Sequence, residues 1–509
     1  MRALLRNILR QECDKHVARH FDYLYQLHED ISRKSVRLGA PVPKQVKHPP
    51  YWAIDGRFNP FKVRTNRKLE KYSYTIARKV RNKTYNPSTA VIQSIPKDDG
   101  EQRQIYVFQL SDSALSRLVY KSLLNKNVNR FSAYAYAYRE DKGAHDAIIN
   151  IFSEWRNLDR VYVAEFDFSK FFDNIRHEYI WDILERQGFL YTPEESFIIK
   201  KFLSCKNVPL SNYDPLGGEV RDCGIPQGTS ISLFLANAVC CELDKELERL
   251  GVGFSRYADD TLIWSHSYDK IVQAYEIINK HATRMGVPIN IEKSKGITLV
   301  TTPRHKDPEM KAKHSVTYLG YEISLDKISI AQKRAEKIKA RISYIIYQNL
   351  IQPLRNGTYN RNRLAGIDLD YVVALYQVRR YLYGGLDSHR LQSYLIGAIP
   401  NLKFRGLMSY YPIVNNVEQL SQLDGWLIHT FKQALKLRQS LWQSYAGINL
   451  PGPVVNWIDQ IADFKRWTAP SVRTYDLQIP SFLLINRAMQ LAIKKKGLTG
   501  VANPKGTYY

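Results

Sequence analysis

The sequence is poor in cysteine, with five residues among 509, and their positions show no paired spacing typical of a metal site. Two of them, Cys240 and Cys241, are adjacent and cannot close as an ordinary disulfide bond. This scarcity excludes a disulfide framework. We therefore expect reduced thiols and a cytoplasmic protein.

Long hydrophobic runs are also missing. The most apolar stretch, residues 231–243, contains Asn237 and is too short to cross a bilayer. Arginines interrupt the apolar residues of the first ten positions, which is unlike a signal peptide. These features predict a soluble intracellular protein with no membrane partner.

Acidic residues are few relative to basic ones. The 49 Asp and Glu face 74 Lys and Arg, which gives a formal net charge of +25. Such an excess favours a polyanionic partner, either nucleic acid or an anionic membrane surface. The 34 Tyr and 8 Trp favour nucleic acid, because bases stack on aromatic faces. A hydrophobic content of 44% excludes wholesale disorder, and the length suggests two to four domains.

Two adjacent carboxylates, Asp259 and Asp260, lie in the middle of the apolar and aromatic stretch 254–264. The pattern predicts a β-hairpin with the acids at its tip, and a hairpin turn without chemistry would explain them equally well. A third acid, Asp167, ends another apolar run at 161–167. Two strands that bring carboxylates to one point would form a divalent-metal site for phosphoryl transfer.

Two other stretches could contact a ligand. A predicted hairpin over 91–108 carries Lys97 and Arg103 near its tip, where they could close over a triphosphate, although such exposed cations are common. The stretch 224–228 has two glycines and a proline around Gln227, which predicts a tight turn that approaches a ligand closely. A generic loop before a helix explains those glycines but gives Gln227 no role.

The remaining pattern alternates helices and strands, as in an α+β sheet protein. The basic segment 58–86, with interleaved tyrosines, is either a solvated face or a nucleic-acid contact. Strict alternation of small and aromatic residues over 133–138 predicts an extended segment, whose aromatic face packs on the core or stacks on bases. Helices are predicted over 1–40, 111–128, 229–250, 268–285 and most of 331–509.

Over about residues 90–325 the chain resembles the reverse transcriptases, because six motifs occur in that family's order. They are Ile95-Pro-Lys97 with Arg103, Phe166-Asp167-Phe-Ser-Lys-Phe-Phe172, Gly224-Ile-Pro-Gln-Gly228, Tyr257-Ala-Asp-Asp260, Glu292-Lys-Ser-Lys295 and Tyr318-Leu-Gly320. The segment 131–147 also looks like the one that precedes the first catalytic motif in bacterial and group II intron enzymes.

The resemblance implies an α+β right-hand polymerase that makes DNA on an RNA template. Residues 1–57 would be an N-terminal helical extension and connector, and 58–325 the fingers and palm. Residues 326–509 would form a mostly α-helical thumb and C-terminal domain with a flexible tail.

The resemblance also assigns roles at the metal site. Asp167 and Asp259 would hold two Mg²⁺ ions, with Asp260 at the margin of the site and the Phe168 carbonyl in the metal shell. Phe172 matches the family's aromatic steric gate, which excludes a 2′-hydroxyl and so selects dNTPs.

Other roles follow for the nucleotide. Lys97 and Arg103 would hold the triphosphate, and Gln227 would line the nucleotide pocket. Either Lys293 or Lys295 would assist the leaving group, and the sequence does not choose between them.

Departures from the family narrow the subgroup. No RNase H-like acid cluster, integrase-like region or zinc-finger endonuclease tail is visible, and no Val-Thr-Gly triplet like that of retron enzymes follows Gly320. The long helical C-terminal region resembles the bacterial antiviral reverse transcriptases. That resemblance implies a structured noncoding RNA partner and assembly into homo-oligomers. Some members prime synthesis from a protein tyrosine, for which Tyr508 and Tyr509 are the candidates.

Three alternatives stay open. An RNA-dependent RNA polymerase shares the metal chemistry, although Phe172 argues against it. A catalytically silent RNA-binding scaffold is disfavoured by the presence of all three acids. A generic basic nucleic-acid-binding protein explains the charge but not the ordered motifs.

Overall fold

The computed structural model describes residues 1–96, 100, 102–292, 294, 296–302, 310, 312–364, 366–468 and 474–501. These residues divide into two compact units. The first contains residues 1–29, 44–147 and 160–313, and the second contains residues 30–43, 148–159 and the described residues from 314 on. No helix in these ranges is both long and apolar enough to cross a membrane.

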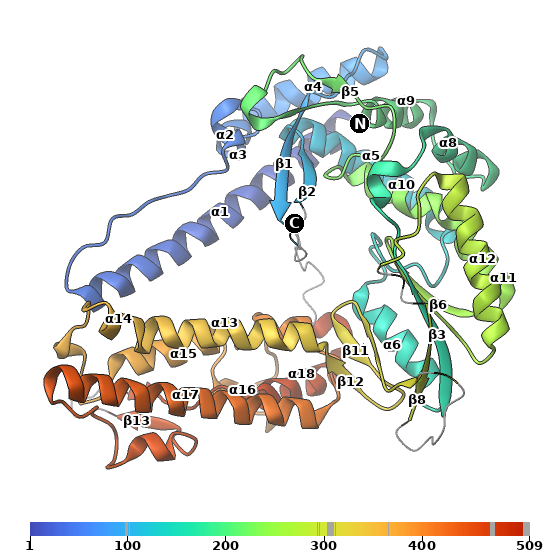
Figure 1. The fold of residues 1–509 in the computed structure, drawn as a ribbon. Coiled ribbons are helices and arrows are strands. Elements are labelled where there is room, and N and C mark those ends of the chain that lie inside the picture. The colour runs from blue at the N-terminus through green and yellow to red at the C-terminus, as the bar shows by residue number, and fades with distance from the viewer. Residues whose placement is uncertain are drawn as a thin grey trace. The chain divides into compact units, whose positions relative to one another are not determined.

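The strands on either side of Asp259 and the strand before Asp167 belong to a five-stranded sheet of the first unit, in the order β6-β7-β3-β8-β9. Figure 1 labels β3, β6 and β8 of this sheet. Its strands come from distant parts of the sequence: β3 (Arg160–Phe166), β6 (Gly253–Tyr257), β7 (Asp260–Ser265), β8 (Ile297–Thr301) and β9 (Ala312–Lys313). The central strand β3 pairs antiparallel with both β7 and β8. Helices α11 (Cys241–Leu250) and α12 (Tyr268–Met285) pack on this sheet. The predicted hairpin around Asp259 and Asp260 is confirmed.

A second sheet of the first unit has the order β2-β1-β4-β5. It contains β1 (Ala90–Pro96), β2 (Gln102–Val107), β4 (Lys206–Pro209) and β5 (Glu219–Val220). The antiparallel pairing of β1 with β2 confirms the predicted hairpin over 91–108.

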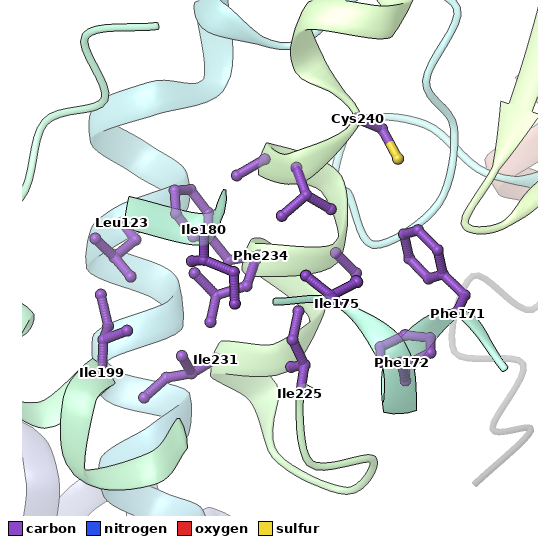
Figure 2. Packing of buried hydrophobic residues seen from close by; sticks show 14 of the residues in the cluster. Leu123, Phe171, Phe172, Ile175, Ile180, Ile199, Ile225, Ile231, Phe234 and Cys240 are labelled. Carbon is purple, nitrogen blue, oxygen red and sulfur yellow. The ribbon is translucent and has the colours of Figure 1, made fainter. Parts of the chain in front are cut away.

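Helices surround the two sheets of the first unit. They are α1 (Arg2–Leu38), whose last turns belong to the second unit, α2 (Tyr51–Ile54), α3 (Pro60–Val63), α4 (Asn66–Arg81), α5 (Leu110–Asn127), α7 (Phe171–Asn174), α8 (His177–Arg186), α9 (Pro193–Leu203) and α10 (Ser230–Val239). Their apolar faces meet in one large core that includes Phe171, Phe172 and Phe234 (Figure 2). The predicted helices over 1–40, 111–128 and 268–285 are confirmed.

Two local predictions were wrong. The segment 133–138, predicted to be extended, is instead a series of turns with one isolated bridge, between Ala135 and Arg256. Ala135, Tyr136 and Ala137 are all buried, so the alternation of small and large residues does not separate a core face from a solvent face. The segment does pack on the core, as one of the two interpretations held.

The second wrong prediction concerns the helix expected to run to Leu250. It is two helices, α10 and α11, which meet at Cys240. Thr229 caps α10, because its Oγ1 accepts a hydrogen bond from the amide of Ser232 at 3.2 Å, and Gly251 ends α11 in the left-handed conformation. All five cysteines are free thiols.

The second unit is mostly helical, as predicted. It contains most of α6 (Ala144–Trp155), together with α13 (Gln332–Leu350), α14 (Gln352–Arg355), α15 (Leu369–Tyr383), α16 (Ser388–Leu395), α17 (Val417–Ala446) and α18 (Phe482–Lys496). Its strands are β10 (Val316–Tyr318), β11 (Tyr321–Ile323), β12 (Ile328–Ile330), β13 (Arg466–Thr468) and β14 (Thr474–Asp476).

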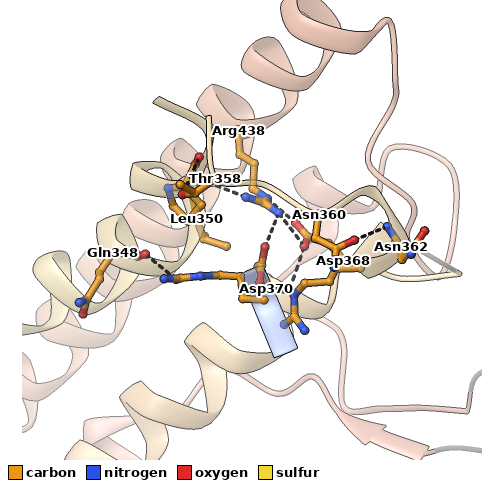
Figure 3. Close-up of polar contacts among 11 residues, drawn as sticks. Gln348, Leu350, Thr358, Asn360, Asn362, Asp368, Asp370 and Arg438 are labelled. Atoms are coloured by element: carbon orange, nitrogen blue, oxygen red, sulfur yellow. Dashed lines mark hydrogen bonds and ion pairs between the residues drawn. The ribbon is translucent and has the colours of Figure 1, made fainter. Parts of the chain in front are cut away.

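A buried ionic cluster joins the helices of the second unit. The guanidinium of Arg438, on α17, donates to Asp368 at 2.6 Å and to Asp370 at 3.0 Å, and also to the carbonyl of Leu350 at 2.7 Å (Figure 3). Asp368 in turn caps α15. Arg438 therefore connects the end of α13, the start of α15 and the middle of α17.

Candidate active site

Of the two adjacent acids, Asp259 lies in a two-residue turn between β6 and β7, and Asp260 is the first residue of β7. Tyr257 pairs with Asp260, which leaves Ala258 and Asp259 as the central residues of the turn. Ala258 has φ +63° and Asp259 does not have a positive φ, which is the pattern of a type II′ turn. Glycine is the usual residue at that first position, so Ala258 stores backbone strain of about 1–3 kcal/mol. The surroundings must therefore hold this turn in place.

Asp167 is positioned by the register of the neighbouring strand. Phe166 is the partner of Thr261 in the β3–β7 ladder, so Asp167 and Asp260 occupy the next pair of positions. Opposed residues of an antiparallel pair have Cα atoms about 5 Å apart. The backbone of Asp167 is held on its other side, where its carbonyl accepts a hydrogen bond from the amide of Asn290 at 2.8 Å. The register thus brings the three predicted acids to one edge of the sheet.

The backbone of Phe168 is also held, because it forms an isolated bridge with Ile289. The Phe168 side chain is buried against Phe171, with ring centroids 5.6 Å apart, so only its backbone could serve a ligand at the sheet edge.

Within the described ranges, no group of three or more His, Cys, Asp and Glu side chains is arranged to hold a metal ion. This arrangement is compatible with Mg²⁺, which usually binds one or two carboxylates together with substrate phosphates and water. Carboxylate oxygens are also the donor type that Mg²⁺ prefers. The residues therefore fit the expected ion by chemistry and register.

A buried arginine, Arg256, supports the turn by a hydrogen bond to its backbone. The Arg256 side chain is 0% exposed and donates from Nη1 to the carbonyl of Ala258 at 3.1 Å. Its other nitrogens donate to the fully buried carboxylate of Asp244, on α11, at 2.7 and 2.6 Å. Burial alone would lower the pKa of Arg256, but the Asp244 carboxylate raises that pKa above its usual value. Arg256 therefore stays charged and fixes the strained residue of the turn.

The hydrogen bonds of Arg256, which we call the buried brace together with its partner Asp244, extend into two other segments. Arg256 Nη1 also lies 3.2 Å from Oδ1 of Asn237, whose amide donates to the carbonyl of Ala137 at 2.7 Å. The backbone of Arg256 exchanges hydrogen bonds with Tyr134 and Tyr136, at 3.0 and 2.9 Å. A network from α10, α11 and the 133–138 segment thus converges on the residue beside the acidic turn.

Sequence reasoning missed Arg256 and Asp244. The available signal was Asp244 itself, an acid on the apolar face of α11 in register with Cys240, Cys241 and Leu247. A carboxylate at such a position needs a buried partner, and Arg256 in the adjoining buried strand is the cation nearest to the turn.

The structure brings together two residues that were predicted to contact the nucleotide. Arg103 Nε donates to Oε1 of Gln227 at 2.7 Å, and the Gln227 carbonyl accepts from the amide of Tyr106 at 2.7 Å. Gly228 has φ +132°, and a Cβ there would lie far inside contact distance of the Tyr106 carbonyl oxygen. The loop over 224–228 therefore needs glycine in order to lie directly on β2.

The same loop is attached to the turn that carries Phe172. The amide of Ile225 donates to the Phe172 carbonyl at 2.6 Å, and the amide of Gly224 donates to the Ile175 carbonyl at 2.9 Å. The Phe172 ring is 5% exposed and lies at the border of the core beside Phe171 (Figure 2). Gln227 and Phe172 therefore belong to one rigid assembly.

Five of the predicted site residues lie outside the described residues. They are Lys97, Lys293, Lys295, Tyr508 and Tyr509. Their roles stay predictions.

Comparison with known proteins identifies the domain that carries this site. Residues 95–323 match the family of reverse transcriptases (RNA-dependent DNA polymerases). The chain is 24% identical over 260 residues to the retron Ec86 reverse transcriptase of Escherichia coli, and the match covers 50% of this chain and 69% of that protein.

Solved structures give weaker similarity. Telomerase from Candida albicans, in complex with a fragment of telomeric RNA, has a TM-score of 0.40 and 14% identity, covering 78% of this chain and 69% of that one. Apo telomerase from Candida tropicalis has a TM-score of 0.38 and 12% identity, covering 75% and 71%. Because both TM-scores are below 0.5, the assignment depends on the sequence matches and on the α+β architecture described above. Residues 95–323 are therefore a reverse transcriptase domain, and the protein is an RNA-directed DNA polymerase.

Proposed function

We propose that this polymerase adds dNTPs by two-metal phosphoryl transfer, with Asp167 and Asp259 holding two Mg²⁺ ions and Asp260 at their margin. The observation that supports this proposal is the strand register, which sets Asp167 opposite Asp260 beside the turn that contains Asp259. The Phe168 carbonyl is the remaining protein oxygen assigned to the metals. When bound, the ions would activate the attacking hydroxyl and stabilise the leaving pyrophosphate.

The chain's own residues would orient the nucleotide. The hydrogen bond between Arg103 and Gln227 fixes a cation at the loop over 224–228, where it can pair with triphosphate oxygens. Phe172, fastened to that loop through its carbonyl, would lie against the sugar and exclude a 2′-hydroxyl. Lys97 would add a second cation for the triphosphate, and Lys293 or Lys295 would assist the leaving group.

The proposed domain division follows from these roles. Residues 58–325 would act as fingers and palm, and 326–509 as thumb and C-terminal domain. Residues 1–57 would be an extension that precedes the fingers.

The direct test measures dTTP incorporation on poly(rA) primed with oligo(dT) by wild type and Asp259→Asn. We expect a loss of about a thousandfold or more, because the variant removes several kcal/mol of stabilisation from the transition state. Asp269→Asn is the matched control, since Asp269 is an exposed acid in the first turn of α12. Activity of Asp259→Asn within tenfold of this control would refute the assignment. Preferential use of UTP would favour the RNA polymerase alternative.

We further propose that the protein acts in antiviral defence with a structured noncoding RNA, as a homo-oligomer. The match to a retron reverse transcriptase and the mostly helical second unit support this proposal. Sequencing the RNA and DNA that copurify with the protein tests it, and a single abundant RNA is the expected result. Bulk cellular RNA would contradict it. If Asp259→Ala kept full protection against phage, the protein would instead act as a silent scaffold.

Protein priming is the last part of this proposal. Tyr508 or Tyr509 would supply the first hydroxyl in place of a nucleic-acid primer. Mass spectrometry of the C-terminal peptide after incubation with dNTPs should then show a nucleotide adduct. An unmodified peptide in a reaction that makes DNA would exclude these two tyrosines.

A further inference from the structure

A basic stripe runs along α4, on the side of the helix that faces solvent. Arg67, Lys71, Tyr74, Arg78 and Arg81 follow one another at steps of four, three, four and three residues, and all five are exposed. At 3.6 residues per turn this spacing places them on one narrow face. At a rise of 1.5 Å per residue, the stripe is about 21 Å long.

The opposite face of α4 is apolar and buried. Leu69, Ile76, Ala77 and Val80 lie on that face and belong to the hydrophobic interior of the first unit. An amphipathic helix that binds a membrane must present its apolar face to the lipid. Because the apolar face of α4 is already buried, the stripe offers charge alone.

The stripe retains its positive charge. Among the described residues, no ion pair forms with Arg67, Lys71, Arg78 or Arg81. The one acid of α4, Glu70, lies beside the stripe and pairs with Arg2 and Arg6 of α1. Two cations share that single carboxylate, so this contact also leaves a net positive charge.

Tyr74 organises the middle of the stripe. The residue is 49% exposed, and two guanidinium groups lie over its ring, Arg2 at 5.2 Å and Arg78 at 5.9 Å from the ring centroid. These cation–π contacts occupy the ring and hold both guanidinium groups at the surface. Tyr74 is therefore a support for cations rather than a free platform on which a base could stack.

From these contacts we infer that the α4 stripe binds the phosphate backbone of a double-stranded RNA segment, at a site separate from the catalytic turn. A row of cationic side chains that offers no open aromatic ring for base stacking recognises the charge and shape of the backbone. Proteins bind helical RNA in this way. Figure 1 places α4 beside α9 and away from β3 and β6, within the same unit. The inference rests on the proposal that the protein holds a structured RNA, and it does not depend on catalysis.

The test uses the full chain and a fluorescein-labelled 20-base-pair RNA duplex of mixed sequence, without dNTPs or Mg²⁺, followed by anisotropy between 50 and 200 mM KCl. In the triple variant Arg67→Gln, Lys71→Gln, Arg78→Gln we expect duplex affinity to fall about 100-fold. The slope of log K against log [KCl] should fall by about 2.7, since each duplex phosphate contact contributes about 0.9.

The matched control removes the same number of positive charges elsewhere on the first unit, by Arg249→Gln, Lys270→Gln and Lys280→Gln on α11 and α12. Its affinity for the duplex should stay within about threefold of wild type. Equal weakening by the two triple variants would show that only net charge matters and would overturn the inference.

Two further measurements separate this site from the catalytic one. The KM for poly(rA) primed with oligo(dT) should be the same in both triple variants, and a selective rise in the stripe variant would assign α4 to the template channel instead. A selective loss of binding to single-stranded oligo(U) with unchanged duplex affinity would also overturn the inference. Loss of duplex binding in an enzyme without polymerase activity would support the stripe while refuting the proposed chemistry.

Discussion

Replacing Arg256 by methionine tests whether the buried brace positions the acidic turn. Arg256 and Asp244 are both 0% exposed and are joined by hydrogen bonds of 2.7 and 2.6 Å. The variant would leave the Asp244 carboxylate buried without its cation, which costs about 3–5 kcal/mol. We expect the free energy of unfolding of the first unit to fall by that amount in urea denaturation.

Stability and activity can be separated by a double variant. Arg256→Met with Asp244→Leu removes both charges, and a buried pair replaced by apolar side chains is often close to neutral in stability. The double variant should therefore regain most of the lost stability. It would still lack the hydrogen bond to the Ala258 carbonyl, so the strained turn would lose its support.

The expected kinetic effect follows from that one hydrogen bond. A hydrogen bond from a charged donor is worth about 1.5–3 kcal/mol, which corresponds to a drop in kcat of about 10- to 150-fold. KM for dTTP on poly(rA) primed with oligo(dT) should change little, because the brace does not reach the loop over 224–228. Positioning, rather than binding, would then explain the loss.

An exposed ion pair provides the control. Arg64 pairs with Asp14 at 3.7 Å, and the two side chains are 45% and 52% exposed, so Arg64→Met should cost at most about 1 kcal/mol. If Arg256→Met were no more destabilising than this control, the buried pair of Arg256 and Asp244 would not contribute to the stability of the first unit. If the double variant regained wild-type kcat, Arg256 would have no role in positioning the turn.

Three more predictions address other contacts. Gly228→Ala should lose stability and nearly all polymerase activity, since its φ and its contact with β2 exclude a Cβ; Gly425→Ala, in the open middle of α17, should instead stabilise by about 0.5–1 kcal/mol in thermal denaturation. Phe172→Val should raise the ratio of UTP to dTTP incorporation at least tenfold, whereas Phe171→Val, at a similarly buried position, should lower stability alike without changing that ratio. Arg438→Met should lower the stability of the second unit by about 3–5 kcal/mol, measured by calorimetry, and an unchanged transition would refute its role in the buried cluster.

Local chain properties were enough to predict much of the fold. Alternating apolar residues around Asp259 predicted a hairpin with acids at its tip, and the apolar run before Asp167 predicted a strand that ends at that acid. Both are local patterns with clear periods, so tertiary contacts did not override them. The start of the helix predicted over 229–250 was equally local, because Thr229 caps α10.

Longer-range features could not be predicted in this way. The alternation over 133–138 suggested an extended segment, but its middle residues Ala135, Tyr136 and Ala137 are all buried, and the backbone of Tyr134 and Tyr136 pairs with Arg256. The contact between Arg103 and Gln227 spans 124 positions, and nothing in either local pattern indicates it. Such contacts are set by how the sheets pack, which a single sequence does not display.

The pairing of Arg256 with Asp244 beside the acidic turn could not be predicted from local patterns either. An unpaired guanidinium at Arg256 would attract the Asp259 carboxylate and compete with a metal ion for it. Asp244 cancels that charge, so Arg256 can hold the Ala258 carbonyl without adding net positive charge to the turn. Burial also raises the pKa of the neighbouring Cys240 thiol to about 12, which keeps that thiol neutral beside Asp259. The buried groups around Arg256 thus fix the position of the turn and add almost no net charge to it. The negative potential at the sheet edge therefore comes from the acids that we assign to the metal ions.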